Sequence, residues 1–332
     1  MFQLENLYKI VGEENVQCDE LLSKHTTFHI GGEARYFVSP AYIEDFIMAV
    51  RYIREENIPY FIMGNGSNLL AHDKGYDGVI LATHLSGRKI PEYEGKTTLD
   101  GWKELPPGAE GREKYESLIS EEGLEQKTII FAGSGIMLST LANIIGKRGL
   151  TGFEFASGIP GTLGGAVTMN AGAYGGEIKD CILGAQVMLP DGTTAFFKKE
   201  ELELGYRSSR IQKEALIVLW ALFAFEQGDV ITIEETMRDM NQKRREKQPL
   251  QYGSAGSTFK RPEGYFAGKL IEDAGLKGYR VGDVMVSDKH CGFVVNVGEG
   301  TYEDARQVIE HVQKTVQEKF GVLLEPEVKM IQ

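Results

Sequence analysis

The stretch Ser157-Gly-Ile-Pro-Gly-Thr-Leu-Gly-Gly-Ala-Val-Thr-Met-Asn-Ala-Gly-Ala-Tyr-Gly-Gly176 decides how this chain is interpreted. A flexible linker would contain little besides Gly and Ser, whereas this stretch keeps apolar residues at Leu163, Val167 and Met169. Glycine in a packed segment indicates backbone that another group approaches closely, and the N–H groups of such turns bind anions. We interpret the stretch as a cradle for the pyrophosphate of a nucleotide cofactor. The alternative interpretation is a run of tight turns between strands.

Two further glycine turns favour the cofactor interpretation. Gly64-Asn-Gly-Ser-Asn68 follows a strand-like run over residues 60–63, and a helical spacing of apolar residues over 43–53 precedes that run. The turn is not the dinucleotide fingerprint, which requires GxGxxG between a strand and a helix. Ala132-Gly-Ser-Gly135 follows a third strand-like run, residues 128–131. Three such turns predict a cofactor that lies across a domain.

Composition restricts the possible functions. The net charge of −12 argues against nucleic-acid binding, which needs a basic surface, but permits a phosphorylated ligand in a local cationic pocket. The cysteines at 18, 181 and 291 form no close pair, so we expect neither a disulfide framework nor a metal site. We see no signal peptide at the N-terminus. The longest apolar run, residues 215–225, is shorter than the about 20 residues that span a bilayer and predicts a buried strand. We therefore expect a cytoplasmic protein without membrane or nucleic-acid partners.

Several motifs, in order along the chain, resemble those of the UDP-N-acetylenolpyruvoylglucosamine reductase family, the flavoproteins of peptidoglycan precursor synthesis. The motifs are His25-Thr-Thr-Phe-His-Ile-Gly-Gly32, residues 64–68, residues 158–176, Gly205-Tyr-Arg-Ser208, Gly256-Ser-Thr-Phe259 and Glu325-Pro-Glu-Val328. The resemblance covers nearly the whole chain. It implies an α+β fold, with a two-subdomain FAD-binding part of the vanillyl-alcohol-oxidase type and a C-terminal α+β substrate-binding domain.

Pattern and resemblance together predict four parts of the chain. Residues 1–90 form the N-terminal FAD-binding subdomain, 91–126 an acidic insertion, 127–228 the second FAD-binding subdomain, and 229–332 the substrate-binding domain. We expect a helix over residues 1–20, a helix over 232–247 that Pro249 stops, and a last helix over 305–320 that Gly321 closes. A terminal strand is expected over residues 323–331.

The acidic insertion is the part without a counterpart in the family. Residues 92–125 carry ten acidic and four basic residues and contain Pro106-Pro107. Residues 112–122 predict a short surface helix. We expect a solvated excursion that contributes little to a core, so that a short turn could replace it with most turnover preserved. The competing hypothesis is that Trp102 or Tyr115 folds over the flavin as a lid.

The resemblance implies an NADPH-dependent flavoenzyme that reduces the enolpyruvyl ether of UDP-N-acetylglucosamine to the lactyl ether, giving UDP-N-acetylmuramate. NADPH passes a hydride to FAD, and the sugar nucleotide then receives it in the same site. The chain resembles the second type of the family, which lacks a lid loop, because the connection between residues 225 and 231 is too short for one. The alternatives are another FAD-dependent oxidase or dehydrogenase on this scaffold, or a flavin or nucleotide-sugar binding protein without turnover.

Three residues carry catalytic roles by this resemblance. Arg207 would clamp the substrate carboxylate, Glu327 would partner the developing enolate, and Ser257 would donate the proton. Without the resemblance, Arg207 is a surface arginine, Ser257 a turn residue and Glu327 a polar residue on an edge strand. Arg210 competes with Arg207, and Glu325 with Glu327, for the same roles.

The remaining site residues follow from the glycine turns and the resemblance. The cofactor-binding residues are Gly64, Asn65, Gly66, Ser67, Asn68, Leu69, Ile159, Pro160, Gly161, Thr162, Gly164, Gly165, Asn170, Ala171 and Gly172. The substrate-binding residues are Tyr174, Lys247, Arg261, Lys269 and His290. We expect FAD and NADPH as cofactors, a UDP-sugar as substrate, no metal, and a monomeric protein.

Overall fold

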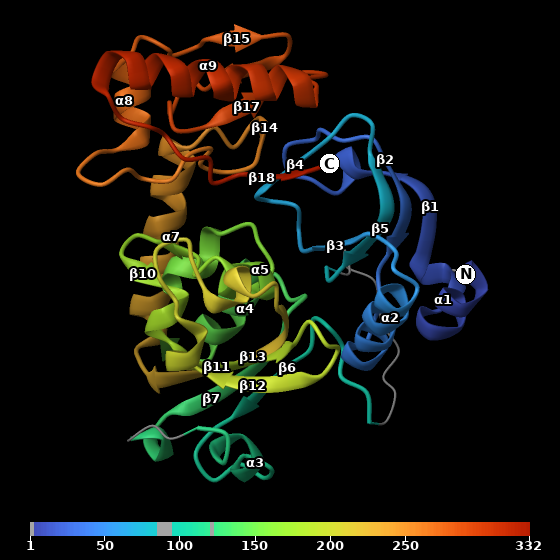
Figure 1. Cartoon of the computed structure of the whole chain (residues 1–332). Coiled ribbons are helices and arrows are strands. Elements are labelled where there is room, and N and C mark those ends of the chain that lie inside the picture. The colour runs from blue at the N-terminus through green and yellow to red at the C-terminus, as the bar shows by residue number, and fades with distance from the viewer. Residues whose placement is uncertain (1–2, 85–94, 120–122) are drawn as a thin grey trace. The chain divides into compact units, whose positions relative to one another are not determined.

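The computed structural model describes residues 3–84, 95–119 and 123–332 (Figure 1). The chain divides into two compact units, and each unit collects segments that are far apart in the sequence. Unit 1 consists of Met1–Val16, Val38–Gly64 and Leu81–Gln242, and unit 2 of Gln17–Phe37, Asn65–Ile80 and Lys243–Gln332.

An antiparallel sheet forms the centre of unit 1. Its strand order is β12-β11-β13-β7-β6, with β8 paired to the end of β13. The strands are β6 (Trp102–Leu105), β7 (Thr128–Gly133), β8 (Leu150–Thr151), β11 (Ile182–Met188), β12 (Thr194–Lys198) and β13 (Ile217–Gln227). The predicted strands at residues 128–131 and 215–225 are thus confirmed as β7 and β13.

Both faces of this sheet are buried, which explains why β13 is almost continuously apolar. Ala221 and Phe223 point to one face, where they pack with helices α4 (Leu138–Lys147), α5 (Leu163–Thr168) and α7 (Val230–Lys247). Leu222, between them, points to the other face and packs with Phe131 and Leu105. In Figure 1 the short helix α3 (Glu113–Glu116) lies on the side of the sheet away from α4 and α5.

The acidic segment forms a layer that covers the face of the sheet on which Leu222 lies. The expectation of a solvated excursion is therefore wrong for its described residues. β6 pairs with β7 along four residues, and Leu105, Tyr115 and Leu124 are buried against the sheet. The guanidinium of buried Arg112 donates hydrogen bonds to the carbonyls of Leu105, Lys127 and Leu124. Residues 92–94 and 120–122 lie outside the described residues.

Neither aromatic residue proposed as a lid is placed to act as one. Tyr115 is 9% exposed and contacts the rings of Phe131 and Trp220. Trp102 pairs in β6, and the guanidinium of Arg148 lies 4.3 Å from the centre of its ring. The acidic composition concealed this layer because its few apolar residues are spaced irregularly between charged ones.

The other elements of unit 1 follow the sequence patterns more closely. They are α1 (Leu4–Val11), α2 (Ile43–Glu55), β3 (Tyr60–Met63), β9 (Gly172–Ala173), β10 (Gly176–Glu177) and α6 (Arg210–Lys213). The predicted helices over 43–53 and 232–247 are confirmed. The helix expected over residues 1–20 ends at Val11, because Gly12 adopts φ 86° and residues 16–21 form strand β1.

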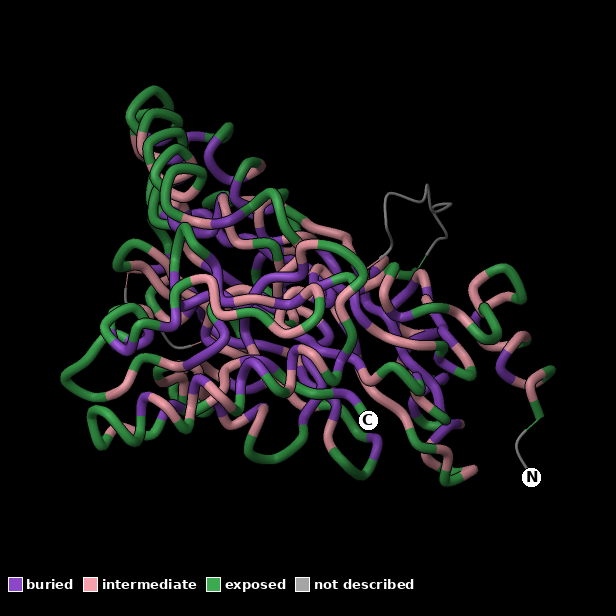
Figure 2. The backbone as a smooth tube through the Cα atoms, turned by 90° about the horizontal axis from the view of Figure 1, so that it is seen from above, coloured by how far each residue is buried: buried purple, intermediate pink, exposed green. Residues whose placement is uncertain are grey.

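Unit 2 contains several short strands and the helices α8 (Ala267–Asp273) and α9 (Tyr302–Phe320). Strands β1 (Val16–Leu21), β2 (Glu33–Val38) and β5 (Tyr76–Ala82) pair in that order, and β14 (Gly253–Ser254), β17 (Val294–Asn296), β16 (Val284–Val286) and β15 (Arg280–Val281) form a second sheet. Helices α8 and α9 pack in one core with β16 and β17 of the second sheet. Buried and exposed residues alternate along the helices in Figure 2, as expected for helices that bury one face.

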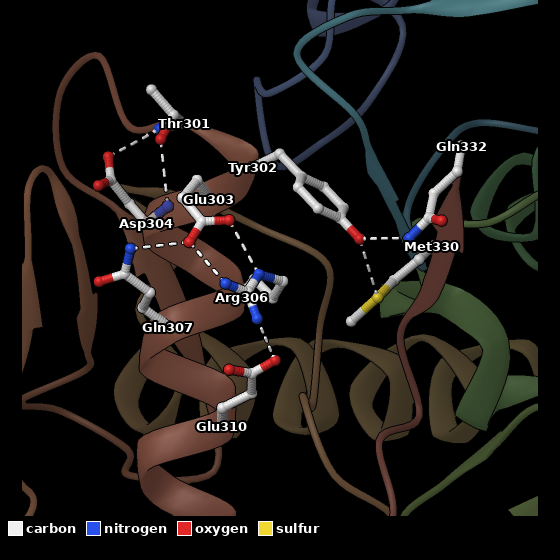
Figure 3. A network of polar contacts seen from close by, with 9 residues as sticks. All are labelled: Thr301, Tyr302, Glu303, Asp304, Arg306, Gln307, Glu310, Met330 and Gln332. Carbon is white, nitrogen blue, oxygen red and sulfur yellow. Dashed lines mark hydrogen bonds and ion pairs between the residues drawn. The ribbon is translucent and has the colours of Figure 1, made fainter.

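The last helix holds the C-terminal segment in place. Thr301 and Asp304 form a capping box at the start of α9, and Gly321 ends the helix in the left-handed conformation, as predicted. Figure 3 shows the ion pairs of Arg306 with Glu303 and Glu310 on the same helix. The Tyr302 hydroxyl contacts Met330 Sδ at 3.3 Å and accepts a hydrogen bond from Gln332.

The C-terminal strand is shorter than expected. β18 (Lys329–Ile331) pairs in parallel with β4 (Leu69–Ala71), whereas the preceding residues form no regular strand and include an isolated bridge between Pro326 and Phe259. Proline lacks the N–H that a continuous ladder requires.

Replacing Arg112 tests whether the acidic segment is a folded layer. Arg112→Met should lower the free energy of unfolding by about 3 kcal/mol, because it leaves buried carbonyls without a donor. Chemical denaturation measures this value. Lys147→Met is the control, since it removes the same charge from an exposed position on α4 and should change stability by less than about 0.5 kcal/mol. Equal effects of the two changes would contradict the assignment.

Candidate functional site

Three glycine segments meet in unit 1 through contacts that no side chain would permit. A Cβ atom on Gly64 would lie 2.3 Å from Thr162 Oγ1, and one on Gly164 would lie 2.9 Å from Ser134 Cβ. Backbone hydrogen bonds join the same segments, from Gly164 N to Ser134 O and from Leu138 N to Gly161 O. The structure therefore brings together the three turns that the sequence singled out.

Two buried hydroxyl groups in this cluster lack a partner among the described residues. Ser134 and Thr162 are each 1% exposed, and neither Ser134 Oγ nor Thr162 Oγ1 makes a hydrogen bond. An unpaired buried hydroxyl costs about 1–3 kcal/mol, so such groups normally have a function. A phosphorylated cofactor fits here, because its oxygens accept hydrogen bonds and glycine lets them approach the backbone. Ser134 belongs to the third glycine turn, but we did not single it out from the sequence.

Asn170, predicted to bind the cofactor, uses its side chain within the protein. Its Nδ2 donates to Glu177 Oε2 at 2.8 Å and to the Gly205 carbonyl at 3.0 Å, and its Oδ1 accepts from Lys179 N. Hydrogen bonds from Lys179 and Asn170 hold the pKa of Glu177 below its usual value, so Glu177 is a carboxylate at neutral pH. Asn170 thereby connects the glycine cradle to the turn that contains Arg207.

Arg207 occupies a strained position in that turn. Gly205 and Ser208 exchange two backbone hydrogen bonds, and Arg207, the third residue of the turn, has φ 50°. Residues other than Gly, Asn and Asp rarely adopt this conformation, and strain of this kind is common at functional sites. The adjacent Ser209 is fully buried and donates to the Thr168 carbonyl, which anchors the turn to α5.

The competing Arg210 is engaged elsewhere. It begins α6, where its Nε donates to Glu214 Oε1 at 2.8 Å, and its guanidinium lies over the ring of Phe197.

In unit 2, backbone hydrogen bonds join the segment that contains Ser257 to the segment that contains Glu327. Residues 257–260 run antiparallel to residues 325–327, with Glu327 N donating to Thr258 O and Lys260 N to Glu325 O. Asn68 Nδ2 donates to the Glu327 carbonyl at 3.2 Å. The second part of the glycine turn at 64–68 therefore lies next to both predicted catalytic residues of this unit.

The side chains around this crossing differ in their accessibility. Ser257 is exposed and follows Gly256, which has φ 75° and faces the Ser67 carbonyl. Lys260 forms an ion pair with Glu325. Buried Thr258 accepts a hydrogen bond from Val294 N and fixes the strand behind Ser257.

The predicted substrate-binding residues of unit 2 fall into two groups. His290 is close to the crossing, because Gly292 joins both: its carbonyl accepts from Thr258 N, and its N–H donates to His290 Nδ1 at 3.1 Å. The neutral His290 ring therefore carries its proton on Nε2. Lys269 instead forms an ion pair with Asp273 on the exposed face of α8.

The other predicted site residues lie in several different elements. Lys247 is the exposed last residue of α7, and Tyr174 is 47% exposed in the turn between β9 and β10. Leu69 begins β4, which pairs with β18, and Ile159 and Pro160 lie between Gly158 and Gly161 of the cradle.

Within the part of the chain that the structure describes, we find no group of three or more His, Cys, Asp and Glu residues that could hold a metal ion. None of the described helices is long and apolar enough to cross a bilayer.

The fold and the glycine cluster define a flavin-binding protein. A family model described as FAD binding domain matches residues 119–197, which include Ser134, Thr162 and the cradle. A second model, described as the C-terminal domain of UDP-N-acetylenolpyruvoylglucosamine reductase, matches residues 248–331, which include Ser257 and Glu327.

The chain belongs to the UDP-N-acetylenolpyruvoylglucosamine reductase family. It is 49% identical to the protein of that name from Lachnoclostridium phytofermentans, over 99% of this chain and 96% of the relative, and 43% identical to the one from Caldanaerobacter subterraneus, over 99% and 97%. The crystal structure of the reductase from Thermus caldophilus superposes with a TM-score of 0.72 at 31% identity, over 96% of this chain and 99% of that one. The predicted family, fold class and FAD cofactor are confirmed.

The unpaired hydroxyls generate a test of the cofactor site. Ser134→Ala and Thr162→Val should each raise the Kd for FAD about tenfold, because a hydrogen bond to a charged group is lost only in the bound state. The thermal midpoint of the FAD-free protein should not fall, since no bond is lost there. Flavin fluorescence titration and thermal unfolding measure the two quantities.

Ser209→Ala is the matched control for that test. The Ser209 hydroxyl is buried but paired, so its removal should destabilise the FAD-free protein by about 1 kcal/mol. A similar loss of stability in Ser134→Ala or Thr162→Val would show that these hydroxyls have structural partners and would contradict the assignment.

Proposed function

We propose that this protein catalyses the NADPH-dependent, FAD-mediated reduction of UDP-N-acetyl-3-O-(1-carboxyvinyl)-glucosamine to UDP-N-acetylmuramate. The observation that supports the proposal is the crossing of residues 257–260 with 325–327, whose backbone hydrogen bonds bring the segment that contains Ser257 to the segment that contains Glu327. Membership of the reductase family along almost the full chain supports it. FAD, when bound, supplies the hydride transfer that no protein side chain can perform.

Ser257 and Glu327 perform the acid–base part of this reaction. Hydride addition to the terminal carbon of the enolpyruvyl group leaves negative charge on the carboxylate end, and Glu327 would stabilise the enolate that forms there by donating a hydrogen bond from its protonated carboxyl group. Ser257 then gives its proton to the adjacent carbon. A hydroxyl is a weak acid in water, so this step requires a site that excludes water and contains nearby cations.

Arg207 binds the substrate carboxylate and stabilises the charge that develops on it. Its planar guanidinium offers two parallel N–H donors to a carboxylate. The turn that contains it is held by Asn170 and Ser209, so the backbone from which the guanidinium extends is in place before the substrate arrives. Such preorganisation makes electrostatic stabilisation effective. The cofactor-binding roles of residues 64–69 and 159–172 are part of the same proposal, with Asn170 acting through its hydrogen bonds to the turn.

The nucleotide-sugar part of the substrate requires cations. Lys247, Arg261, Lys269 and His290 are our candidates for the diphosphate and sugar, and Tyr174 for a contact near the cradle. His290 would act as a neutral donor through Nε2. Lys269 is the weakest of these candidates because Asp273 already neutralises it.

The remaining predictions complete the proposal. We propose FAD-binding subdomains over residues 1–90 and 127–228, the acidic segment over 91–126, and a substrate-binding domain over 229–332. We further propose a monomeric, cytoplasmic enzyme that acts on a small molecule and binds neither nucleic acid nor membranes. The net charge of −12 supports the last point, because phosphate backbones and anionic lipids repel an acidic surface.

An absorbance experiment tests the proposed function. The purified protein should be yellow, NADPH should bleach the flavin in the absence of air, and the enolpyruvyl sugar nucleotide should restore the colour. A flavin that NADPH bleaches but the sugar nucleotide fails to restore would indicate another oxidase or dehydrogenase. A flavin that NADPH does not bleach would indicate a binding protein.

Ser257→Ala separates the two halves of the reaction. Flavin reduction by NADPH should remain nearly unchanged, whereas reoxidation by the sugar nucleotide should slow on the order of 10²-fold, since general acid catalysis contributes at least that much. Stopped-flow absorbance measures both rates. An equal slowing of both would show that Ser257 has a structural role.

Arg207→Lys tests whether the planar fork of the guanidinium matters. It should be as defective in sugar-nucleotide turnover as Arg207→Ala, because an ammonium group cannot form the bidentate pair. Steady-state kcat/KM for the sugar nucleotide is the measurement, and Arg210→Lys provides the control. Near-normal turnover of Arg207→Lys, or a greater loss in Arg210→Lys, would contradict the assignment.

A further inference from the structure

Thr27, in the motif at residues 25–32, contacts two other segments of unit 2. Its main-chain N–H donates to the Gly66 carbonyl at 3.3 Å. Its hydroxyl donates to the Ser254 carbonyl at 2.6 Å, and Ser254 N donates back to the Thr27 carbonyl at 2.9 Å. Gly66 belongs to the glycine turn at 64–68, and Ser254 precedes Ser257 by three residues. Thr27 therefore joins a cofactor-binding turn to the segment that contains the proposed proton donor.

The hydroxyl of Thr27 supplies a hydrogen bond that its main chain cannot supply. Ser254 lies in β14, the outer strand of its sheet, and pairs with β17 on one side. On its other side Ser254 presents an N–H and a carbonyl, and the Thr27 carbonyl accepts from that N–H. Each residue has a single main-chain N–H, and that of Thr27 is directed to Gly66. A residue without a hydroxyl could therefore donate to only one of the two segments.

The neighbouring Thr26 uses its hydroxyl differently. Thr26 is 2% exposed, and its Oγ1 donates to the Ile30 carbonyl at 3.1 Å, within the same motif. This bond stabilises the local turn, in which His29 N also donates to the Thr26 carbonyl. The hydroxyl of Thr27 instead bonds outside the motif, so the stability of the motif itself does not explain it.

The segment that contains Ser257 is held on both sides of that residue. Downstream, Thr258 N donates to the Gly292 carbonyl, and the Thr258 hydroxyl accepts from Val294 N. Upstream, Ser254 is held by its two hydrogen bonds with Thr27. Between them lies a glycine, residue 256, with φ 75°, and glycine allows a wide range of backbone conformations. The position of Ser257 therefore depends on both anchors.

The glycine turn lies along the same segment. A Cβ on Gly256 would lie 3.9 Å from the Ser67 carbonyl oxygen. Gly66, which precedes Ser67, has φ 63° and accepts the hydrogen bond from Thr27 N. One residue thus contacts both the turn and the segment next to it, so a change at Thr27 alters how the two lie relative to each other.

We propose that Thr27 is a positioning residue, which holds Ser254 and Gly66 together and thereby sets where Ser257 lies relative to the cofactor-binding turn. This inference rests on the proposed function, in which Ser257 protonates the carbon next to the one that receives the hydride. A misplacement of about 1 Å can slow a reaction on the order of 10²-fold. Reduction of the flavin by NADPH needs no proton from Ser257. The effect of Thr27 should therefore fall on the half-reaction with the sugar nucleotide.

Thr27→Val tests this role, because valine has a similar shape and lacks the hydroxyl. On the FAD-loaded full-length protein, reoxidation by the sugar nucleotide should slow about tenfold, while reduction by NADPH and the Kd for FAD stay within about twofold of wild type. Thr27→Ser retains the hydroxyl and should bring reoxidation to within about threefold of wild type. Stopped-flow absorbance measures both rates, and flavin fluorescence titration measures the Kd.

Thr26→Val is the matched control, because it removes the hydroxyl of the adjacent residue, whose bond stays within the motif. It should leave the ratio of the two rates unchanged. A double variant tests whether Thr27 acts through Ser257. In the Ser257→Ala background, Thr27→Val should slow reoxidation no further, since two changes that act on one step are not additive.

Several results would overturn the proposal. Equal slowing of both half-reactions in Thr27→Val, or loss of its fold or its flavin, would show a general structural role. Reoxidation as slow in Thr27→Ser as in Thr27→Val would show that the hydroxyl is not the important group. A selective loss in Thr26→Val, or a further tenfold loss in the double variant, would also contradict it.

The experiment separates this inference from the proposed function. A wild-type protein whose reduced flavin the sugar nucleotide fails to reoxidise contradicts the proposed function. A wild-type protein that is reoxidised normally, with an unchanged rate in Thr27→Val, contradicts only the role of Thr27.

Discussion

Close approach of backbone to backbone is the constraint on which unit 1 depends. A Cβ on Gly135 would lie 2.0 Å from the Thr83 carbonyl oxygen, and one on Gly133 would lie 2.3 Å from that of Leu99. Only glycine permits these contacts, so the strand ends and the cradle can converge. The convergence leaves two hydroxyls, of Ser134 and Thr162, buried and unpaired. The unit thus retains polar groups for a cofactor at some cost to its own stability.

Unit 2 depends on a different constraint, the pairing of irregular backbone. Residues 257–260 and 325–327 exchange hydrogen bonds without forming a regular sheet, since Pro326 interrupts the ladder. The contacts of Tyr302 with Met330 and Gln332 hold the chain end, and β18 pairs with β4. These contacts hold the chain end that follows Glu327, and the crossing holds the backbone of Glu327 next to that of Thr258.

The acidic segment shows how charge and burial can coexist in a short stretch. Apart from Arg112, its described charged residues are exposed or half-buried, while Leu105, Tyr115 and Leu124 cover apolar side chains of the central sheet. Arg112 makes this possible, because its guanidinium satisfies carbonyls that would otherwise be buried without donors. Without the segment, the sheet face around Leu222 and Phe131 would be exposed to water. The segment is a layer of the fold, although its net charge resembles that of a solvated loop.

The family, the three glycine turns, and the helices and strands with a regular hydrophobic period, such as α2, α7, α9 and β13, could be predicted from the sequence. These signals are local, since periodicity and turn chemistry are properties of neighbouring residues. The sequence did not predict which buried atoms lack a partner among the described residues, that Asn170 supports the Arg207 turn, or that Thr27 joins two distant segments. It also did not predict the strand within residues 1–20 or the core role of Tyr115. Such facts depend on partners distant in the chain, which composition and spacing do not specify.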